Sequence, residues 1–451
     1  GTEEGVPMLA SVLRSMLRGS TFVIGLAAWL VACGIPGDPE TTIDLHGRVI
    51  ADFDRPVAQI QVTATGATPA LTTADGRFVL EGVPVPYDLI VYSELAPYAH
   101  VYQGLTRADP AVMGSGVRFI LPMEGAATSS VTGPIDPSPA TGEITRVCAE
   151  GDAVGVAGCR TVHAGDDTYA FDATWFEVDD VAGHVRAVTW TLDAQSVPLA
   201  VAMRGQVAAT FVDGVPTTPG DLVLESGVDP GALDVTVEAP PETVPGTVAC
   251  GALSVITGHD VLPVPNWIAT RATMQVGVPV FEDGPRTVYC FAAVGDGGAA
   301  AWQTGIPSAQ DAVTIELPRP PELIGPEPEA PAVPREATFR VGAVDSAAYL
   351  FEFVPDGVIG PPSFAVSTME PEIRVPDLTS LATSLEIPAG TPYRWRVYRF
   401  EGLGDADALA DEGGVLAPMI RLEAASSVGF GGGPATSWLE SNSPWRSFTF
   451  E

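Results

Sequence analysis

The sequence of 451 residues contains no lysine: its 22 basic residues are all arginine, against 56 aspartates and glutamates. The formal net charge of −34 at pH 7 argues against a nucleic-acid partner, because neutralising phosphates requires clustered basic side chains. Only 17% of the residues are charged and 46% are hydrophobic. This composition excludes a disordered chain and allows large buried cores.

Long apolar segments at helical spacing are absent as well. The recurring pattern is a short segment of alternating apolar and polar residues, such as "VRFIL", "VTIEL" and "RVYRF", bounded by proline, glycine and aspartate. The 42 prolines and 48 glycines fit a chain with many turns between strands. The sequence therefore predicts an all-β protein built from tandem antiparallel β-sandwich domains.

Motifs that mark common catalytic sites are missing too. The five histidines are scattered and none lies in an H-E-x-x-H pair, and "MGSGV" at 113–117 is not a G-x-S-x-G elbow. We interpret two adjacent carboxylate pairs, Asp166–Asp167 and Asp179–Asp180, as solvated strand ends in an acid-rich chain. We therefore predict no catalytic residue, no cofactor and no enzymatic activity. The alternative is a hydrolase with its site in residues 124–317.

The first of five cysteines, Cys33, follows a short basic region and the uncharged stretch "STFVIGLAAWLVA". This stretch has signal-peptide length and is shorter than the ~20 apolar residues that a membrane-spanning helix needs. Its end, "LVAC", resembles the lipobox of bacterial lipoproteins. The resemblance implies that residues 1–32 are a cleaved leader, that Cys33 carries lipid and incorporates palmitate, and that residues 33–41 are a tether.

The residue after Cys33 is glycine. In bacterial lipoproteins an aspartate there retains many members on the inner membrane, so the resemblance implies an outer membrane lipoprotein. Several acyl chains would hold the protein on the membrane, since each buried methylene contributes about 0.8 kcal/mol. The alternative is an ordinary secretory signal followed by a chance cysteine.

The four remaining cysteines are an even number in a chain with an export signal, which predicts two disulfides. Four cysteines allow three pairings. We favour Cys148 with Cys159 and Cys250 with Cys290, because each pair then falls within one predicted domain. A zinc site is the alternative, but it lacks C-x-x-C spacing and has only His163 near a cysteine.

Residues 42–123 show the clearest domain pattern. Two apolar alternations are followed by "ADGRF" at 74–78, in which Asp75-Gly76 suits a tight hairpin. This order resembles the carboxypeptidase regulatory-like (transthyretin-like) domain, which implies a β-sandwich without catalytic residues. The matching residues are Gly47, Val49, Pro56, Val57, Val62, Thr73, Asp75, Gly76, Phe78, Leu80, Val83 and Tyr87.

Residues 335–451 carry a second resemblance. Tyr393, Trp395 and Val397 alternate with polar residues in "IPAGTPYRWRVYRF", and the chain ends in "SPWRSFTF". These features resemble a fibronectin type III domain, which implies another β-sandwich. The preceding residues 318–334 contain seven prolines, and a segment of this composition favours extended geometry. We predict that this segment is a semi-rigid linker that holds two bodies apart.

Residues 124–317 resemble no family that we can name. Alternating segments such as "VRAVTWTLDA" and "RTVYCFAAV" indicate strands throughout. We predict two β-sandwiches, at 124–222 and 223–317, and one elongated domain is the alternative.

Two weaker ligand sites can be read from single segments. The acidic segment "GDADALADEGG" could offer calcium the oxygens of Asp405, Asp407, Asp411 and Glu412, although it lacks the EF-hand glycine and a solvated loop is the default interpretation. Exposed tryptophans could form a carbohydrate platform, for which the candidates are Trp175, Trp302 and Trp438.

Taken together, these patterns predict a lipid-anchored cell-envelope protein with a non-catalytic binding, scaffold or adhesion role. Its expected partners are the membrane, through the lipid anchor, and envelope proteins or polysaccharide; nucleic acid is not expected. The alternatives are the envelope hydrolase and a carbohydrate-binding protein.

Overall fold

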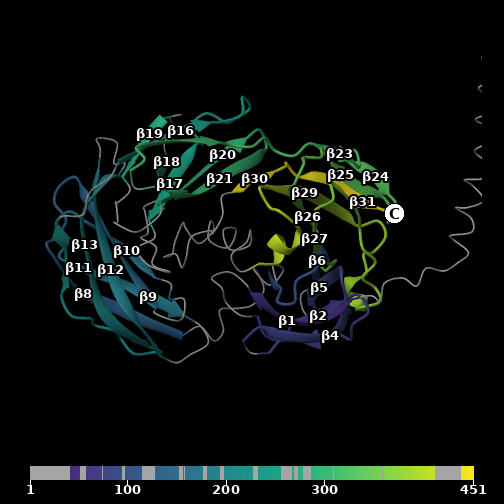
Figure 1. Ribbon diagram of the computed structural model, residues 1–451, viewed down its shortest axis with the longest axis horizontal. Coiled ribbons are helices and arrows are strands. Elements are labelled where there is room, and N and C mark those ends of the chain that lie inside the picture. The colour runs from purple at the N-terminus through teal and green to yellow at the C-terminus, as the bar shows by residue number, and fades with distance from the viewer. Residues whose placement is uncertain are drawn as a thin grey trace, which may run out of the picture.

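The computed structural model describes residues 41–50, 57–73, 75–93, 97–113, 127–151, 156, 158–175, 180–192, 198–226, 232–254, 267–268, 273–277, 286–307, 309–357, 360–411 and 438–451. Within these ranges the secondary structure consists of strands and two short 3-10 helices, so the predicted all-β fold class is confirmed. Figure 1 shows four groups of strands, which we call modules 1 to 4 in chain order.

Module 1 spans residues 42–113. Its strands are β1 (Thr42–Ile50), β2 (Gln61–Ala64), β3 (Ala70–Leu71), β4 (Arg77–Pro84), β5 (Tyr87–Ser93), β6 (Tyr98–Leu105) and β7 (Ala111–Met113). In β1, Leu45 and Val49 are buried while Asp44 and His46 are exposed, because successive side chains of a strand point to opposite faces. The sheet β4-β1-β7 thereby packs against strands β3, β2, β5 and β6.

Module 2 spans residues 127–226. Its strands are β8 (Ala127–Asp136), β9 (Glu143–Gly151), β10 (Cys159–His163), β11 (Thr168–Trp175), β12 (Asp180–Leu192), β13 (Pro198–Val212), β14 (Leu222–Val223) and β15 (Glu225–Ser226). Every second residue of β8 is buried. The sheets β10-β9-β12-β13-β15 and β11-β8-β14 enclose a core that contains Trp175 and Phe211.

Module 3 spans residues 232–317. Its strands are β16 (Ala232–Glu238), β17 (Ala249–Ser254), β18 (Trp267–Ile268), β19 (Thr273–Gly277), β20 (Arg286–Val294), β21 (Gly297–Ile306) and β22 (Ala312–Glu316). The sheet β19-β16-β22 contributes Leu233 and Val235 to its core. Two residues of module 2, Val188 and Trp190 on β12, belong to this same core.

Module 4 spans residues 323–451. Its elements are β23 (Leu323–Gly325), β24 (Ala330–Val333), β25 (Thr338–Val341), β26 (Ala347–Pro355), β27 (Ser363–Thr368), β28 (Glu372–Arg374), η3 (Thr383–Leu385), β29 (Pro392–Glu401), η4 (Ala406–Ala410), β30 (Trp438–Asn442) and β31 (Arg446–Phe450). Its core is aromatic: Phe339 contacts Phe353 and Trp395 edge-on, with ring centroids 4.8 and 5.0 Å away. Phe448 and Phe450 also contact Phe339, which gives the module a tightly packed centre.

Every module pairs an early strand with a late strand in parallel. The pairs are β1 with β7, β8 with β14, β16 with β22, and β24 with β31. Sequence alternation predicted antiparallel sandwiches, and most pairs are antiparallel, but these parallel pairs join strands far apart within each module. They close each sandwich by bringing its two ends together.

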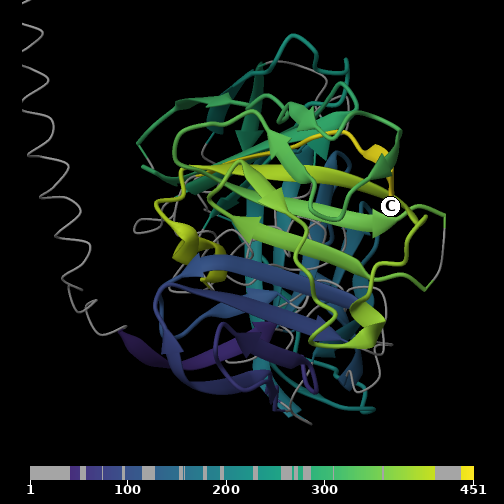
Figure 2. The same cartoon turned by 90° about the vertical axis from the view of Figure 1, so that its right-hand side faces the viewer.

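A continuous 14-stranded sheet crosses modules 1, 3 and 4. Its main path runs β18-β17-β20-β21-β30-β29-β26-β27-β6-β5-β2-β3, with β24 and β31 attached through β29. Strand β30 pairs with β29 of its own module and with β21 of module 3, while β27 pairs in parallel with β6 of module 1. Figure 2 shows the blue strands of module 1 alongside the green strands of module 4. The first and last modules are thus direct neighbours.

The strand pattern differs from two of the predicted domain limits. Residues 318–334 were expected to separate two bodies, but β23 and β24 lie there and pair with β25 and β31. Proline lacks an N–H, yet carbonyl groups in this segment still accept hydrogen bonds: Arg446 donates to the carbonyls of Leu323 and Pro326, both at 2.8 Å. The division expected near residue 222 lies within β14, which pairs with β8, and the strands of module 2 continue to Ser226.

Candidate functional site

The site that most distinguishes this fold is the seam between modules 1 and 4, where β6 and β27 pair in parallel from Tyr98↔Ser363 to Tyr102↔Ser367. The residues of one face, among them Ala99, Val101 and Phe364, enter the aromatic core of module 4. Because this core takes side chains from both modules, separating the two strands would expose apolar surface as well as break main-chain hydrogen bonds.

His100 occupies the opposite face of the seam. Its Nε2 lies 2.8 Å from Oγ of Ser367, and its ring stacks on Tyr102 with centroids 4.1 Å apart. His100 is 1% exposed, and this burial lowers its pKa to about 3. The ring is therefore neutral at physiological pH and binds across the seam as a polar, uncharged group.

A second contact between the modules, which we call the clasp, is formed by η4 and the end of β6. The carboxylate of Asp407 accepts hydrogen bonds from the amides of Thr106, at 2.7 Å, and Arg107, at 3.2 Å, and from the Thr106 hydroxyl. The guanidinium of Arg107 donates to the Asp407 carbonyl and lies 3.5 Å from the carboxylate of Asp411. One short helix thereby binds a turn some 300 residues earlier in the chain.

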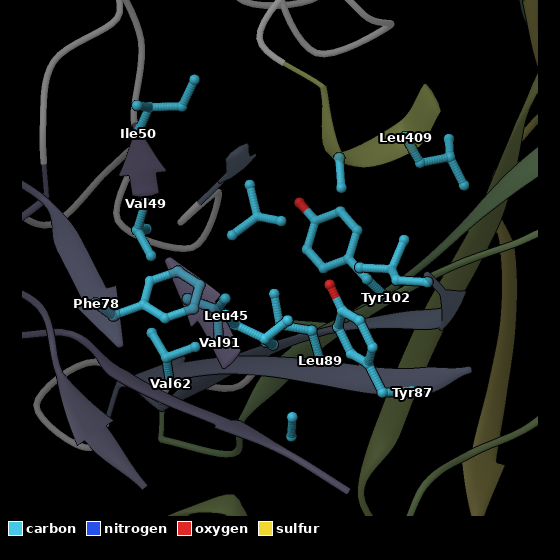
Figure 3. Close-up of a cluster of buried hydrophobic side chains, with 14 of the residues drawn as sticks. Leu45, Val49, Ile50, Val62, Phe78, Tyr87, Leu89, Val91, Tyr102 and Leu409 are labelled. Carbon is cyan, nitrogen blue, oxygen red and sulfur yellow. The ribbon is translucent and has the colours of Figure 1, made fainter. Parts of the chain in front are cut away.

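Apolar side chains lie beneath the clasp. Leu409 and Ala410 of η4, together with Leu403, are buried in the core that contains Tyr102 and Leu105 of module 1. Figure 3 shows Leu409 on the module 4 ribbon, facing this core. The clasp therefore combines polar contacts at its rim with burial at its centre.

Tyr87 connects this core to the polar rim. Its hydroxyl donates to the carbonyl of Arg107 at 2.7 Å. Burial, followed by the charge of Asp407, raises the pKa of Tyr87 above its usual value, while Arg107 opposes this rise. Tyr87 therefore stays protonated and remains a hydrogen-bond donor.

The acidic segment proposed for calcium thus has other partners. Asp405 accepts a hydrogen bond from the amide of Ala408 at the start of η4, whereas Asp407 and Asp411 bind residues of module 1. Within the part of the chain that the structure describes, no three acidic, histidine or cysteine side chains are grouped to hold a metal ion. Glu412 lies outside the described residues.

The predicted disulfides are present. Cys148 and Cys159 face each other on β9 and β10, and Cys250 and Cys290 face each other on β17 and β20, with Cα atoms 4.1 Å apart in both pairs. Each bridge joins two adjacent antiparallel strands of one module, as the local pairing required. Cys33 lies outside the described residues, so its lipidation stays a prediction.

The remaining candidates do not gather into one site. Trp175 and Trp302 are 0% and 3% exposed, so neither can serve as a carbohydrate platform. The side chain of Trp438 is not among those that the structure describes. Asp166 accepts a hydrogen bond from the amide of His163. Asp180 lies at an exposed position at the start of β12. Asp179 lies outside the described residues.

The residues that join modules 1 and 4 were not found from the sequence. The local sequence pattern around these residues indicates only strand or turn. They are Thr106, Arg107, His100 and Ser367. Their contacts span about 260 to 300 residues of chain, and no short motif encodes such a separation. The one local signal was the acidic cluster itself, which was interpreted as a ligand site rather than an internal contact.

No protein-family model and no curated protein sequence matches the chain. Among solved structures it is similar to BcpA, the major pilin subunit of Bacillus cereus, at 9% identity over 61% of this chain and 99% of that one, with a TM-score of 0.13. It is also similar to GBS52, the minor pilin of Streptococcus agalactiae, at 11% identity over 45% and 99% of the two chains, with a TM-score of 0.14.

A further similarity is to a leucine-rich repeat protein from Bacteroides thetaiotaomicron, at 12% identity over 41% of this chain, with a TM-score of 0.14. The chain spans about a quarter of that protein, since the match covers 26% of its length. Among the residues that the structure describes, no helix is long and apolar enough to cross a membrane.

Proposed function

We propose that this chain is a lipid-anchored cell-envelope protein with a non-catalytic scaffold role, in which it binds other envelope components through a rigid β-body. The observation that carries the proposal is the seam. By pairing β6 with β27 and adding the clasp, the fold joins its first module, next to the expected tether, directly to its last. A partner bound anywhere on modules 1, 3 or 4 would then be held at a fixed position relative to the anchor.

The two disulfides support the export part of the proposal. Disulfides persist in oxidising compartments such as the periplasm or the cell surface and are rare in the cytosol. Together with the signal-like segment before Cys33, they favour maturation outside the cytoplasm.

The anchor is tested by changing Cys33→Ala in a diderm bacterial host, with Asp38→Ala as the matched control. Wild type and the Asp38 variant should incorporate a palmitate analogue and sediment with membranes, whereas the Cys33 variant should lose the label and appear in the soluble fraction. Labelling that persists without Cys33 would contradict the lipoprotein assignment.

The scaffold role is tested with the purified mature chain and isolated envelope material. Co-sedimentation with cell-wall sacculi or outer-membrane vesicles should occur without release of soluble sugars or peptides. Robust turnover of a glycan or peptide that is lost on changing Asp180→Ala would instead support the hydrolase alternative.

A further inference from the structure

The outer face of module 2 carries a hollow of about 420 Å³ between β8, β11 and the turn after β13. Its lining consists of Thr128 and Ser130 from β8, Asp172 and Thr174 from β11, and the segment Gly214-Val215-Pro216. Its volume lies within the range of small-molecule and side-chain sites, which is about 300–1,000 Å³. None of the structural or functional contacts described above involves it.

The floor of the hollow is a square of four polar side chains. In the antiparallel pairing of β8 with β11, Ser130 lies opposite Asp172 and Thr128 lies opposite Thr174. Directly opposite residues place their Cβ atoms about 5 Å apart on the same face of the sheet. Among the described residues, none forms a hydrogen bond or ion pair with these four side chains, so all of them are available to a ligand.

Hydrogen bonds to strand β8 hold the wall of the hollow, Gly214-Val215-Pro216, in place. The amide of Gly214 donates to the carbonyl of Thr128, and the amide of Thr128 donates to the carboxylate of Asp213. Underneath, the buried hydroxyl of Ser129 donates to the carbonyl of Val215 at 2.7 Å. Gly214 has a φ of +68°, which favours glycine, so the turn that sets the wall depends on this residue.

The lining is rich in acceptors and carries one negative charge. Three hydroxyls and one carboxylate form the floor, none of the described residues that line the hollow is basic, and Val215 offers apolar surface because it is 51% exposed. A guanidinium group matches this set, since it has five N–H donors and no acceptor and binds a carboxylate in a bidentate manner. The methylene stem of an arginine would cover the apolar wall.

We propose that this hollow binds an arginine side chain presented by a basic partner protein. The net charge of −34 attracts such partners and raises their rate of encounter. A sugar ring fits less well, because the described part of the lining holds no aromatic side chain on which it could stack. A divalent cation would find only one carboxylate among the lining residues.

The test uses the full mature chain with labelled threonine and valine methyl groups and the probe acetyl-Gly-Arg-Gly-amide. We expect the methyl signals of Thr128, Thr174 and Val215 to shift with a dissociation constant on the order of 1 mM, because a single side chain gives few contacts. The citrulline analogue, which has nearly the same shape but no charge, should bind at least about tenfold more weakly, and the lysine analogue should bind several-fold more weakly.

Asp172→Asn should weaken binding of the arginine probe about tenfold. Asp221→Asn is the matched control, because it removes the same charge at another exposed position of module 2. Thr132→Val is a second control on the same face of β8, outside the hollow. Equal loss in Asp172→Asn and Asp221→Asn, or equal binding of the citrulline analogue, would overturn the proposal. So would shifts of the same methyl groups by chitohexaose alone.

Discussion

Two of the joints between modules differ in kind. Modules 1 and 4, at opposite ends of the described chain, are joined by main-chain pairing of β6 with β27, by His100 and by the clasp. Modules 2 and 3 are neighbours in sequence, yet they meet through side chains such as Val188 and Trp190, which reach from the long strand β12 into the core of module 3. Adjacency in the chain therefore does not decide the kind of joint: modules 3 and 4 are also neighbours in sequence, and they are joined by main-chain pairing of β21 with β30.

The disulfides lie outside the two modules that the seam joins. Both disulfides lie in modules 2 and 3, each linking two adjacent antiparallel strands of one module, and neither joins two modules. Joining distant strands costs loop-closure entropy, which grows only slowly with loop length, so extensive main-chain pairing and shared burial can offset it. We infer that modules 1 and 4 depend on each other for stability, whereas modules 2 and 3 are each braced locally.

The largest expected effect comes from a matched pair of tryptophan truncations. Trp395 and Trp190 are both 0% exposed, so replacement of either by alanine should cost about 3–5 kcal/mol of local unfolding free energy. Trp395→Ala should speed amide hydrogen exchange in β26 and β29 and also in β5 and β6, because the core around Trp395 includes Tyr92, Ala99 and Val101. The measurement is hydrogen exchange followed by mass spectrometry.

Trp190→Ala supplies the contrast. In this variant amide hydrogen exchange should increase in β12 and in module 3, while the amides of β5 and β6 should exchange as slowly as in the wild type. If Trp395→Ala left module 1 fully protected, the two ends of the chain would be independent domains and the comparison between the joints would fail.

Removal of the disulfides should have the next largest effect. In the loop-entropy treatment, the Cys250–Cys290 bridge, with a separation of 40 residues, contributes about 4 kcal/mol, and Cys148–Cys159, with a separation of 11, about 3 kcal/mol. Double replacement of each pair by alanine should lower the urea midpoint of its own module, measured by hydrogen exchange at increasing urea. Equal destabilisation of modules 1 and 4 would contradict local bracing.

Features that act within one module could be predicted from the sequence. The alternation of Tyr393, Trp395 and Val397 with polar residues identified the buried face of β29, and an even number of cysteines with local pairing identified both disulfides. Each of these depends on a period of two residues or on a short separation along the chain.

The seam and the clasp could not be predicted, because strand edges carry no sequence record of which distant edge they meet. The amides and carbonyls of β6 are chemically the same whether β27 or solvent lies beside them. Asp407 shows the same limit: its acidic neighbourhood suggested calcium, whereas its actual partners are Thr106 and Arg107. The prolines of 318–334 misled in a similar way, since proline is compatible with edge strands as well as with linkers.

The third prediction concerns the pH dependence of the seam. His100 has a folded pKa of about 3, against 6.5 for an accessible histidine, so below pH 6.5 the unfolded chain binds a proton that the folded chain does not. The contribution of His100 to stability should therefore be fully present above pH 6.5 and fall by about 1.4 kcal/mol per pH unit as the pH decreases toward 3. Urea unfolding between pH 7 and pH 4.5, followed at β6, measures this slope.

His100→Gln should show a shallower slope over that range, because glutamine does not titrate. The control is His163→Gln, at an exposed position of β10 in module 2, which should change the slope less than His100→Gln does. Contributions of the many carboxylates cancel in the comparison. Identical slopes for wild type and His100→Gln would show that His100 is not what couples the seam to pH.

The smallest effect is expected at the clasp. Asp407→Ala removes the acceptor for two amides and a hydroxyl, and since these contacts lie at the surface, the cost should be about 1–2 kcal/mol rather than the value for a buried carboxylate. Asp411→Ala removes an exposed ion pair with Arg107, at 3.5 Å, and should cost less than Asp407→Ala does. Exchange of the Thr106 and Arg107 amides separates the two variants: it should accelerate in Asp407→Ala alone. Unchanged exchange there would mean that the buried Leu409 and Ala410 hold η4 against module 1 without help from the carboxylate. The stability of this joint would then depend on its apolar centre and not on its polar rim.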